Sequence, residues 1–344
     1  MRQLLNTLYV TTEGSYLHLE RDNVRVEVER ELRLQLPLHH LGAVVCFGEV
    51  MMSPALMARC AEDGRSIAFL SRTGRFRCRV EGPTSGNVLL RRAQHRALDD
   101  PEKVANLCRA LVGGKVQNCR QSLLRGSRDA EKEADGLALR EAAGDLARAL
   151  HHLEKRDDPD TIRGYEGEAA HRYFQVFDRM VRPEDRADFA MKGRTRRPPR
   201  DRMNALLSFL YSLLAHDCAA AAEGVGLDAQ MGFLHTLRPG RPGLGLDLME
   251  ELRPVLADRL ALTLINRRQV TAKGLVEREG GSFELTDEAR KEVIVAYQTR
   301  KQEEVQHPAL QEKIPLGLVP HVQARVLARW LRGEIEEYVP FLYR

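Results

Sequence analysis

The sequence predicts an α+β protein, with a small β-rich N-terminal domain followed by a larger all-α C-terminal domain. Up to residue 82, apolar and polar residues alternate with the period of two that is typical of half-buried strands. From residue 89 onward, apolar residues recur at i, i+3 and i+4, as on the buried side of a helix. A chain of 344 residues also exceeds the usual size of one hydrophobic core, which favours two domains.

The N-terminal domain, residues 1–82, combines strand patterns with one short helix. Ser53 and Pro54 open the helix PALMARCAEDG, and Gly64 follows its end. AVVCFG is a continuous apolar run, which suits a strand covered on both faces. We therefore expect a β-sandwich-like domain with one inserted helix. The other predicted strands lie in LLNTLYVTT, SYLHLER, NVRVEVER, SIAFLS and GRFRCRVEG.

A Gly- and Pro-containing stretch at residues 83–88 predicts a linker, and the helical domain then covers residues 89–344. GLVEREGGSFELT predicts one hairpin within it, because Glu279-Gly280-Gly281 separates two alternating runs. The predicted helices are VLLRRAQHRALD, PEKVANLCRALVGGKVQNCRQSLLR, AEKEADGLALREAAGDLARALHHLEK, and approximately residues 159–181, 201–223, 247–268, 287–305 and 319–338.

Composition limits the classes of protein to which the chain can belong. A net charge of +4 is mildly basic and by itself is weak evidence for a nucleic-acid partner. Six cysteines without CxxC spacing argue against a zinc ribbon or a redox motif and suit a reduced cytoplasm. We find no signal-peptide pattern and no run of 18 apolar residues, so we expect a cytoplasmic protein that does not span a membrane.

The stretch FLHTLRPGRPGLGLDLMEELRP places His235, Asp247 and Glu250 around a glycine-rich connection. Asp247 and Glu250 are three apart, so their side chains leave one face of a predicted helix that begins near Leu246. The glycines supply the backbone freedom to fold His235 back over that helix. Carboxylates with one imidazole suit Mg²⁺ or Mn²⁺. The alternative is a capped helix with a solvated acidic face, on which Arg253 neutralises Glu250.

The stretch DTIRGYEGEAAHRYF predicts a helix with Asp160 at its N-cap and Glu166 on a mostly buried face. Gly164 and Gly167 flank Glu166 and suggest that something approaches the backbone closely there. A carboxylate on a buried face needs a partner. The two candidates are Arg163 and a metal ion; taken alone, the stretch favours the ion pair.

The stretch MKGRTRRPPRDRMNALLSFLYSLL carries a basic run directly into a long apolar helix. Such a run is often a mobile, solvated surface. Arginine also pairs bidentately with phosphate, which makes the run a predicted nucleic-acid contact. Arg241, between His235 and Asp247, is placed to bind a phosphate near the predicted metal. The predicted nucleic-acid-binding residues are Arg194, Arg196, Arg197, Arg200 and Arg241.

These three stretches, in this order and at these separations, resemble the CRISPR-associated integrase family (Cas-one), which inserts new spacers into a repeat array. The resemblance implies that Glu166, His235 and Glu250 bind a divalent metal with Asp247 beside the site. Many relatives carry aspartate where this chain has Glu250. The resemblance also implies a homodimer formed through the β-rich domains and a larger complex with the small Cas-two protein.

The implied activity is that of an endonuclease and integrase that joins a DNA 3′-hydroxyl to a phosphodiester by transesterification. Its DNA would be double-stranded, branched or supplied with 3′-OH ends. Asp247 could bind a second ion, orient water or tune the first site. Tyr165 and Tyr211 could contact the end of a DNA strand, although each is more often a core residue. Two alternatives stay open: a metal-dependent nuclease that acts on branched DNA, and a DNA-binding scaffold without catalysis.

Overall fold

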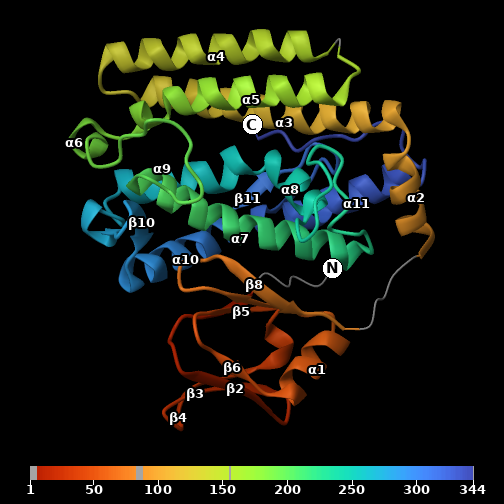
Figure 1. The fold of residues 1–344 in the computed structure, drawn as a ribbon, viewed down its shortest axis with the longest axis vertical. Helices are drawn as coiled ribbons and strands as arrows, with labels where there is room; N and C mark the ends of the chain where they lie inside the picture. The colour runs from red at the N-terminus through yellow and green to blue at the C-terminus, as the bar shows by residue number, and fades with distance from the viewer. Residues whose placement is uncertain (1–5, 83–87, 155, 344) are drawn as a thin grey trace.

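The computed structural model describes residues 6–82, 88–154 and 156–343. The predicted linker, residues 83–88, lies outside the described residues except for Val88, which begins the first helix after it. Figure 1 shows strands at one end of the long axis and helices over the rest of the molecule. The predicted α+β class is therefore confirmed.

The β-rich part consists of two four-stranded sheets. The first has the order β1 (Thr7–Val10), β5 (Ala43–Phe47), β7 (Ser66–Leu70), β8 (Phe76–Val80). The second has the order β4 (Glu31–Pro37), β3 (Asn23–Val28), β2 (Ser15–Glu20), β6 (Met51–Met52). Side chains of both sheets share one core with α1 (Pro54–Glu62). Ser53 caps α1, its Oγ accepting from the Leu56 N–H at 3.2 Å. The strand β4 was not predicted.

The first sheet is covered on both faces, as the apolar run AVVCFG predicts. Its outer face packs on the helical core, where the ring centroids of Phe47 and Phe209 lie 5.9 Å apart. Arg290 also donates to the Arg72 carbonyl at 2.7 Å, which joins the helical part to the loop after β7. The β-rich and helical parts therefore share apolar and polar contacts.

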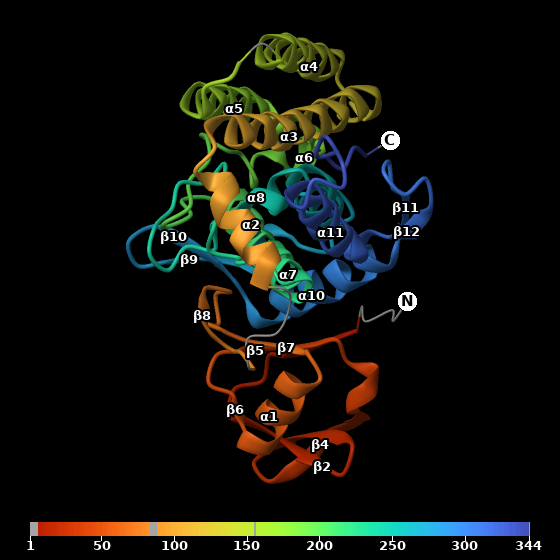
Figure 2. The same cartoon turned by 90° about the vertical axis from the view of Figure 1, so that its right-hand side faces the viewer.

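Three long helices form a layer at the opposite end of the molecule (Figures 1 and 2). They are α3 (Pro101–Asp129), α4 (Glu133–Leu153) and α5 (Pro159–Gln175), and α3 packs against both of the others. The shorter α2 (Val88–Leu98) leads into α3, whose N-cap Asp100 accepts from two backbone N–H groups of the first turn. The predicted helix at 159–181 ends early, at Gln175, and a short 3₁₀ turn, η2 (Phe177–Met180), follows.

The centre of the helical part is α7 (Arg202–Val225), which packs on α8 (Gly243–Glu250) and α11 (Val319–Leu331). Within the described residues, α7 is the one helix whose length and composition would suit a membrane span, and 61% of that window is buried in the protein. Such burial is what a core helix shows. The Asp201 side chain caps α7 by accepting from the Asn204 N–H at 2.7 Å.

The single helix predicted over residues 247–268 is wrong, because the chain there forms three segments. These are α8, a π-helical turn η3 (Arg253–Asp258) and α9 (Arg259–Asn266). Pro254 lies inside the π turn and has no N–H to donate, which interrupts a regular helix. The turn begins three residues after Glu250, and its first residue, Arg253, is buried beside Glu250.

The remaining elements surround this centre. The predicted hairpin is confirmed as β9 (Leu275–Arg278) and β10 (Ser282–Leu285), with Gly280 and Gly281 at positive φ. A second hairpin was not predicted, β11 (Glu304–Gln306) with β12 (Lys313–Pro315). The short α6 (Pro183–Arg186) follows η2, and α10 (Asp287–Gln302) follows β10.

Candidate functional site

The helix α5 presents Glu166 toward the interior. Asp158, rather than the predicted Asp160, is its N-cap and accepts from the Thr161 N–H at 2.7 Å. The Glu166 side chain is 26% exposed, so it lies at the edge of the buried face as predicted. A Cβ added at Gly164 or Gly167 would meet no atom within 4 Å. Within the described residues, no other part of the protein therefore approaches those glycines, and the space beside them is open.

The partner of Glu166 is Lys115 of α3. The Lys115 ammonium donates to Glu166 Oε1, and the Lys115 side chain is only 7% exposed. The alternative partner, Arg163, is wrong: it pairs with Asp160 and donates to the Leu234 carbonyl at 2.7 Å. Arg163 thus holds the segment before His235 against α5.

The glycines before and within α8 allow close packing of the backbone against neighbouring segments. A Cβ on Gly243 would lie 3.0 Å from the Gly232 backbone nitrogen, and one on Gly245 would lie 3.0 Å from the Ala219 Cβ of α7. Only Gly240 of the connection has a positive φ, +72°. The expected backbone freedom therefore does not explain why glycine is present at positions 243 and 245. The helix α8 begins at Gly243, earlier than predicted.

Asp247 is fully buried and lies behind His235. Its carboxylate accepts from the backbone N–H groups of Phe233, Leu234 and His235 at 2.6, 3.1 and 2.9 Å. His235 Nδ1 lies 2.7 Å from the same carboxylate. An ionised carboxylate only accepts, so we assign the imidazole proton to Nδ1, which leaves the Nε2 lone pair free. Asp247 thereby fixes the orientation of His235.

Glu250 is buried and has a cationic partner at each of its two oxygens. Its Oε1 lies 3.0 Å from Arg253 Nη2 and 3.6 Å from His235 Nε2, and its Oε2 lies 2.6 Å from Lys115 Nζ. Burial opposes its ionisation, but Arg253 and Lys115 outweigh burial and lower the pKa of Glu250 to about 2. Burial likewise opposes protonation of Lys115, whereas Glu250 and Glu166 outweigh it and raise the pKa of Lys115.

The donor set of this cluster suits a hard divalent ion. The carboxylates of Glu166 and Glu250 both contact Lys115 Nζ, and the His235 imidazole lies 3.6 Å from Glu250 Oε1. In the described part of the chain, however, no three His, Cys, Asp or Glu side chains are placed to grip one ion as they stand. The ammonium lies between the two carboxylates, which explains why their oxygens do not close on a single point.

Two of the predicted DNA-binding arginines are engaged within the protein. Arg194 donates to the Thr195 carbonyl at 2.7 Å and to Asn204 Oδ1 at 2.5 Å, and burial lowers its pKa. Arg200 donates to the Gly280 carbonyl, so it anchors the basic loop to the β9–β10 hairpin. Both side chains hold the loop in place.

The other predicted arginines gather where two loops meet. Arg196 and Arg197 are exposed, and their charges, together with that of Arg238, lower the pKa of Arg241 further than burial alone. Within the described residues, none of these four forms an ion pair with an acidic side chain. An unpaired group of like charges favours an anion as its partner. We call Arg196, Arg197, Arg238 and Arg241 the arginine cluster; Arg238 was not predicted.

The two tyrosines differ in environment. Tyr165 is partly exposed, with the Arg156 guanidinium carbon 5.5 Å from its ring centroid. Tyr211 is buried and donates to Asp258 Oδ1 at 2.6 Å. The guanidinium carbons of Arg194 and Arg253 lie over the Tyr211 ring, 5.1 and 4.8 Å from its centroid. The geometry makes Tyr211 a core residue between the basic loop and Glu250.

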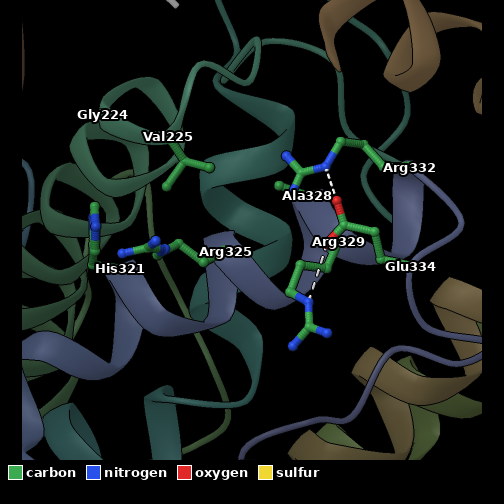
Figure 3. A pocket seen from close by; sticks show the side chains of 8 residues that line it. All are labelled: Gly224, Val225, His321, Arg325, Ala328, Arg329, Arg332 and Glu334. Carbon is green, nitrogen blue, oxygen red and sulfur yellow. Dashed lines mark hydrogen bonds and ion pairs between the residues drawn. The ribbon is translucent and has the colours of Figure 1, made fainter. Parts of the chain in front are cut away.

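A hollow of about 470 Å³ lies beside α11 and contains none of the predicted site residues (Figure 3). Two of its arginines, Arg329 and Arg332, are paired with Glu334 at 3.2 and 2.5 Å. Its imidazole, His321, and its carboxylate, Glu334, lie on opposite sides of the hollow. We therefore place the candidate site at Glu166, His235 and Glu250.

Comparison with known proteins decides the family. The family model described as CRISPR associated protein Cas1 matches residues 8–299. The chain belongs to the Cas1 family. It is 58% identical to a CRISPR-associated endonuclease Cas1 of Moorella thermoacetica over 344 residues, all of both chains. Relatives at this level of identity are named CRISPR-associated endonucleases.

Solved structures agree with a Cas1 fold. A CAS1 protein from Thermotoga maritima is 25% identical, covers 97% of this chain and 98% of its own, and gives a TM-score of 0.81. A casposase bound to integration product is 20% identical, covers 97% of this chain and 92% of its own, and gives a TM-score of 0.84. At that identity the likeness concerns the fold alone.

Sequence reasoning missed Lys115 in this Cas1-family chain. A signal was present, because α3 carries Leu111, Val112, Val116 and Cys119 on its buried side and Lys115 falls among them. A lysine on an apolar helix face needs a buried acidic partner. That partner comes from α5 and α8, which the pattern of α3 alone does not reveal.

Proposed function

We propose that this Cas1-family chain is a divalent-metal-dependent DNA integrase that joins the 3′-OH end of a short duplex to a phosphodiester of a CRISPR repeat array. The observation that carries the proposal is that Glu166 meets Glu250 and His235 from a distant part of the chain. Lys115 joins the two carboxylates, and His235 Nε2 lies 3.6 Å from Glu250 Oε1. Buried carboxylates so close together need positive charge between them. A site of this kind can accept Mg²⁺ or Mn²⁺.

Glu166, Glu250 and His235 Nε2 would hold the ion. When bound, it supplies stabilisation of negative charge on the phosphate oxygens and favours deprotonation of the attacking 3′-hydroxyl. Asp247 keeps His235 in the tautomer that offers Nε2 as a ligand. Glu250 stays ionised because Arg253 and Lys115 lower its pKa to about 2. Asp247 is thus proposed to tune the site by positioning His235.

The arginine cluster is proposed to bind the DNA backbone next to this site. Arg241 belongs to the connection between His235 and Asp247, so a phosphate held there lies on the same loop as the imidazole. Arg196 and Arg197 extend the positive charge along the preceding loop. Both contacts are with phosphate, so we expect them to position DNA without reading its sequence.

The second sheet is proposed to form a homodimer interface. Residues paired across it in one register, Leu32, Glu27, Tyr16 and Met51, share its outer face. Three of them are exposed apolar side chains: Leu32 at 46%, Tyr16 at 38% and Met51 at 63%. A row of exposed apolar residues on a sheet is a candidate protein contact. As family membership implies, we further propose a complex with the small Cas2 protein, in the cytoplasm of a prokaryote.

The decisive test is joining of a fluorescent 3′-OH duplex into supercoiled plasmid carrying a CRISPR array, with Mg²⁺ or Mn²⁺ and with the metal omitted. We expect Glu166→Ala and His235→Ala to abolish joining and to retain DNA binding. Glu168→Ala is the matched control, because Glu168 lies on the same helix and is exposed. Joining that survives both site variants would refute the metal site. Cleavage of branched DNA without joined product would identify a nuclease, and neither activity would leave a scaffold.

The dimer is tested by light scattering of the intact protein after gel filtration. We expect Met51→Glu to convert a dimer into a monomer, because it buries a charge in the proposed interface. Val295→Glu is the control, since Val295 is 55% exposed on α10 in the helical part. An unchanged dimer in the Met51 variant would place the interface elsewhere.

A further inference from the structure

Lys115 is a buried cation that the proposed reaction does not yet use. Its helix, α3, packs against α5 and α8, which carry the two carboxylates of the candidate site. The ammonium donates to Glu166 Oε1 and lies 2.6 Å from Glu250 Oε2, with 7% of the side chain exposed. Lys115 therefore occupies the space that any ion bound by both carboxylates would need.

The charges around this point are nearly balanced without a metal. Glu166 and Glu250 contribute two negative charges, and Lys115 and Arg253 contribute two positive ones. Asp247 adds one negative charge behind His235. A divalent ion added to this set would lie beside an ammonium at close range, which is strongly unfavourable in a buried site. The ion and the ammonium therefore compete for one place.

The environment of Lys115 allows its ammonium to be replaced by a metal ion. Glu250 Oε2 lies 2.6 Å from the ammonium as its buried ionic partner. Glu166, the other partner, is 26% exposed, and the space beside Gly164 and Gly167 is open. A lysine side chain has four rotatable methylene groups and moves its charge easily. The ammonium is thus paired with one carboxylate, Glu166, that solvent reaches.

We propose that Lys115 is a resident counter-cation that holds Glu166 and Glu250 together in the metal-free protein and leaves their shared space when the divalent ion binds. This inference rests on the proposed function, because it takes Glu166 and Glu250 as metal ligands. Lys115 keeps two buried carboxylates folded and ionised before the ion arrives, and it sets the metal affinity lower than the bare carboxylates would give.

The first test measures Mn²⁺ binding without DNA, from the electron paramagnetic resonance signal of free Mn²⁺. The proteins are the full-length wild type, Lys115→Met, Lys115→Arg and Glu166→Gln. Lys103→Met is the control, because Lys103 lies on the same helix and is 57% exposed. We expect Lys115→Met to bind Mn²⁺ about tenfold more tightly than the wild type, and Lys115→Arg and Lys103→Met not to gain affinity. The melting temperature of metal-free Lys115→Met should fall, and Mn²⁺ should raise it more than that of the wild type.

The second test uses the wild type alone and so does not depend on the folding of a variant. The protein is acetylated briefly with acetic anhydride, with and without Mg²⁺, and the modification of each lysine is measured by mass spectrometry. We expect Mg²⁺ to increase acetylation of Lys115 severalfold and to leave Lys103 unchanged. Acetylation of Lys115 that is unaffected by saturating metal would overturn the exchange.

The outcomes separate this inference from the proposed function. One outcome would refute the exchange but keep the metal site: the wild type binds Mn²⁺, Glu166→Gln weakens this binding, and Lys115→Met does not strengthen it. If neither the wild type nor Lys115→Met binds Mn²⁺ through Glu166, both proposals are wrong. Tighter binding by Lys115→Met together with metal-dependent acetylation supports both.

Discussion

Asp247→Asn is the substitution whose effect follows most directly from the geometry. The native carboxylate is fully buried and accepts three backbone N–H bonds and one from His235 Nδ1. Asparagine has a single acceptor oxygen. Whichever way its amide is turned, the NH₂ group faces two N–H donors of the segment 233–235.

The magnitude follows from those bonds. A hydrogen bond to a charged acceptor contributes about 1.5–3 kcal/mol, so loss of two should destabilise the protein by about 3–6 kcal/mol. His235 also loses the partner that fixes its tautomer. Removal of such a supporting group weakens metal binding by about 10–100-fold. The variant should therefore lose both stability and joining activity.

The fluorescence of Trp330 can report on unfolding near Asp247. Trp330 is the only tryptophan of the chain, and its ring centroid lies 6.4 Å from that of Phe233, whose N–H Asp247 accepts. Urea unfolding followed by tryptophan fluorescence thus reports on this segment. Asp228→Asn is the control, because the Asp228 carboxylate accepts one backbone N–H, at 2.8 Å. If Asp247→Asn unfolds within about 1 kcal/mol of the wild type and binds Mn²⁺ equally, the role assigned to Asp247 is refuted.

Other predictions concern separate features. Burial raises the pKa of Asp258 to about 6, so its ionisation lowers the free energy of unfolding as the pH rises from about 4 to 7. In urea titrations, the stability of Asp258→Asn relative to the wild type should therefore increase by about 2 kcal/mol between pH 4.5 and 7.5. A difference in stability that does not change with pH would contradict this. Arg196→Gln with Arg197→Gln should reduce the slope of log affinity for duplex DNA against log salt by about two, and an unchanged slope would remove these residues from the DNA path. Gly245→Ala should destabilise the protein by about 1–3 kcal/mol in the same titrations, because its Cβ would lie 3.0 Å from a side chain of α7; the control Gly224→Ala meets no atom within 4 Å, and equal effects would exclude the clash.

Local patterns were sufficient for most of the fold. The alternation in SYLHLER and NVRVEVER and the helix periodicity after residue 89 follow from which side of each element is buried. Patterns failed where neighbours decide the structure. The interval 247–268 has helical periodicity throughout, but Pro254 and the packing around Arg253 turn its middle into a π turn.

The sequence likewise predicted some contacts of the candidate site and missed others. His235, Asp247 and Glu250 are close in the chain, so their proximity could be predicted from spacing. The partner of Glu166 could not, because Lys115 lies 51 residues away on another helix. Likewise, the basic run showed where arginines are abundant, but only the tertiary structure shows that Arg194 is used internally and that Arg238 joins the exposed ones.

The planar groups around Tyr211 have a consequence for how mutational data should be interpreted. Arg194 from the basic loop and Arg253 beside Glu250 both lie over the same aromatic ring. Substitutions of Arg194 and of Arg253 therefore both change the packing on the Tyr211 ring, and their effects on the free energy of unfolding should not be additive in a double-mutant cycle. A loss of metal affinity after a change at Arg194 would then reflect this mechanical connection, and it would not by itself make Arg194 a ligand of DNA or of the ion.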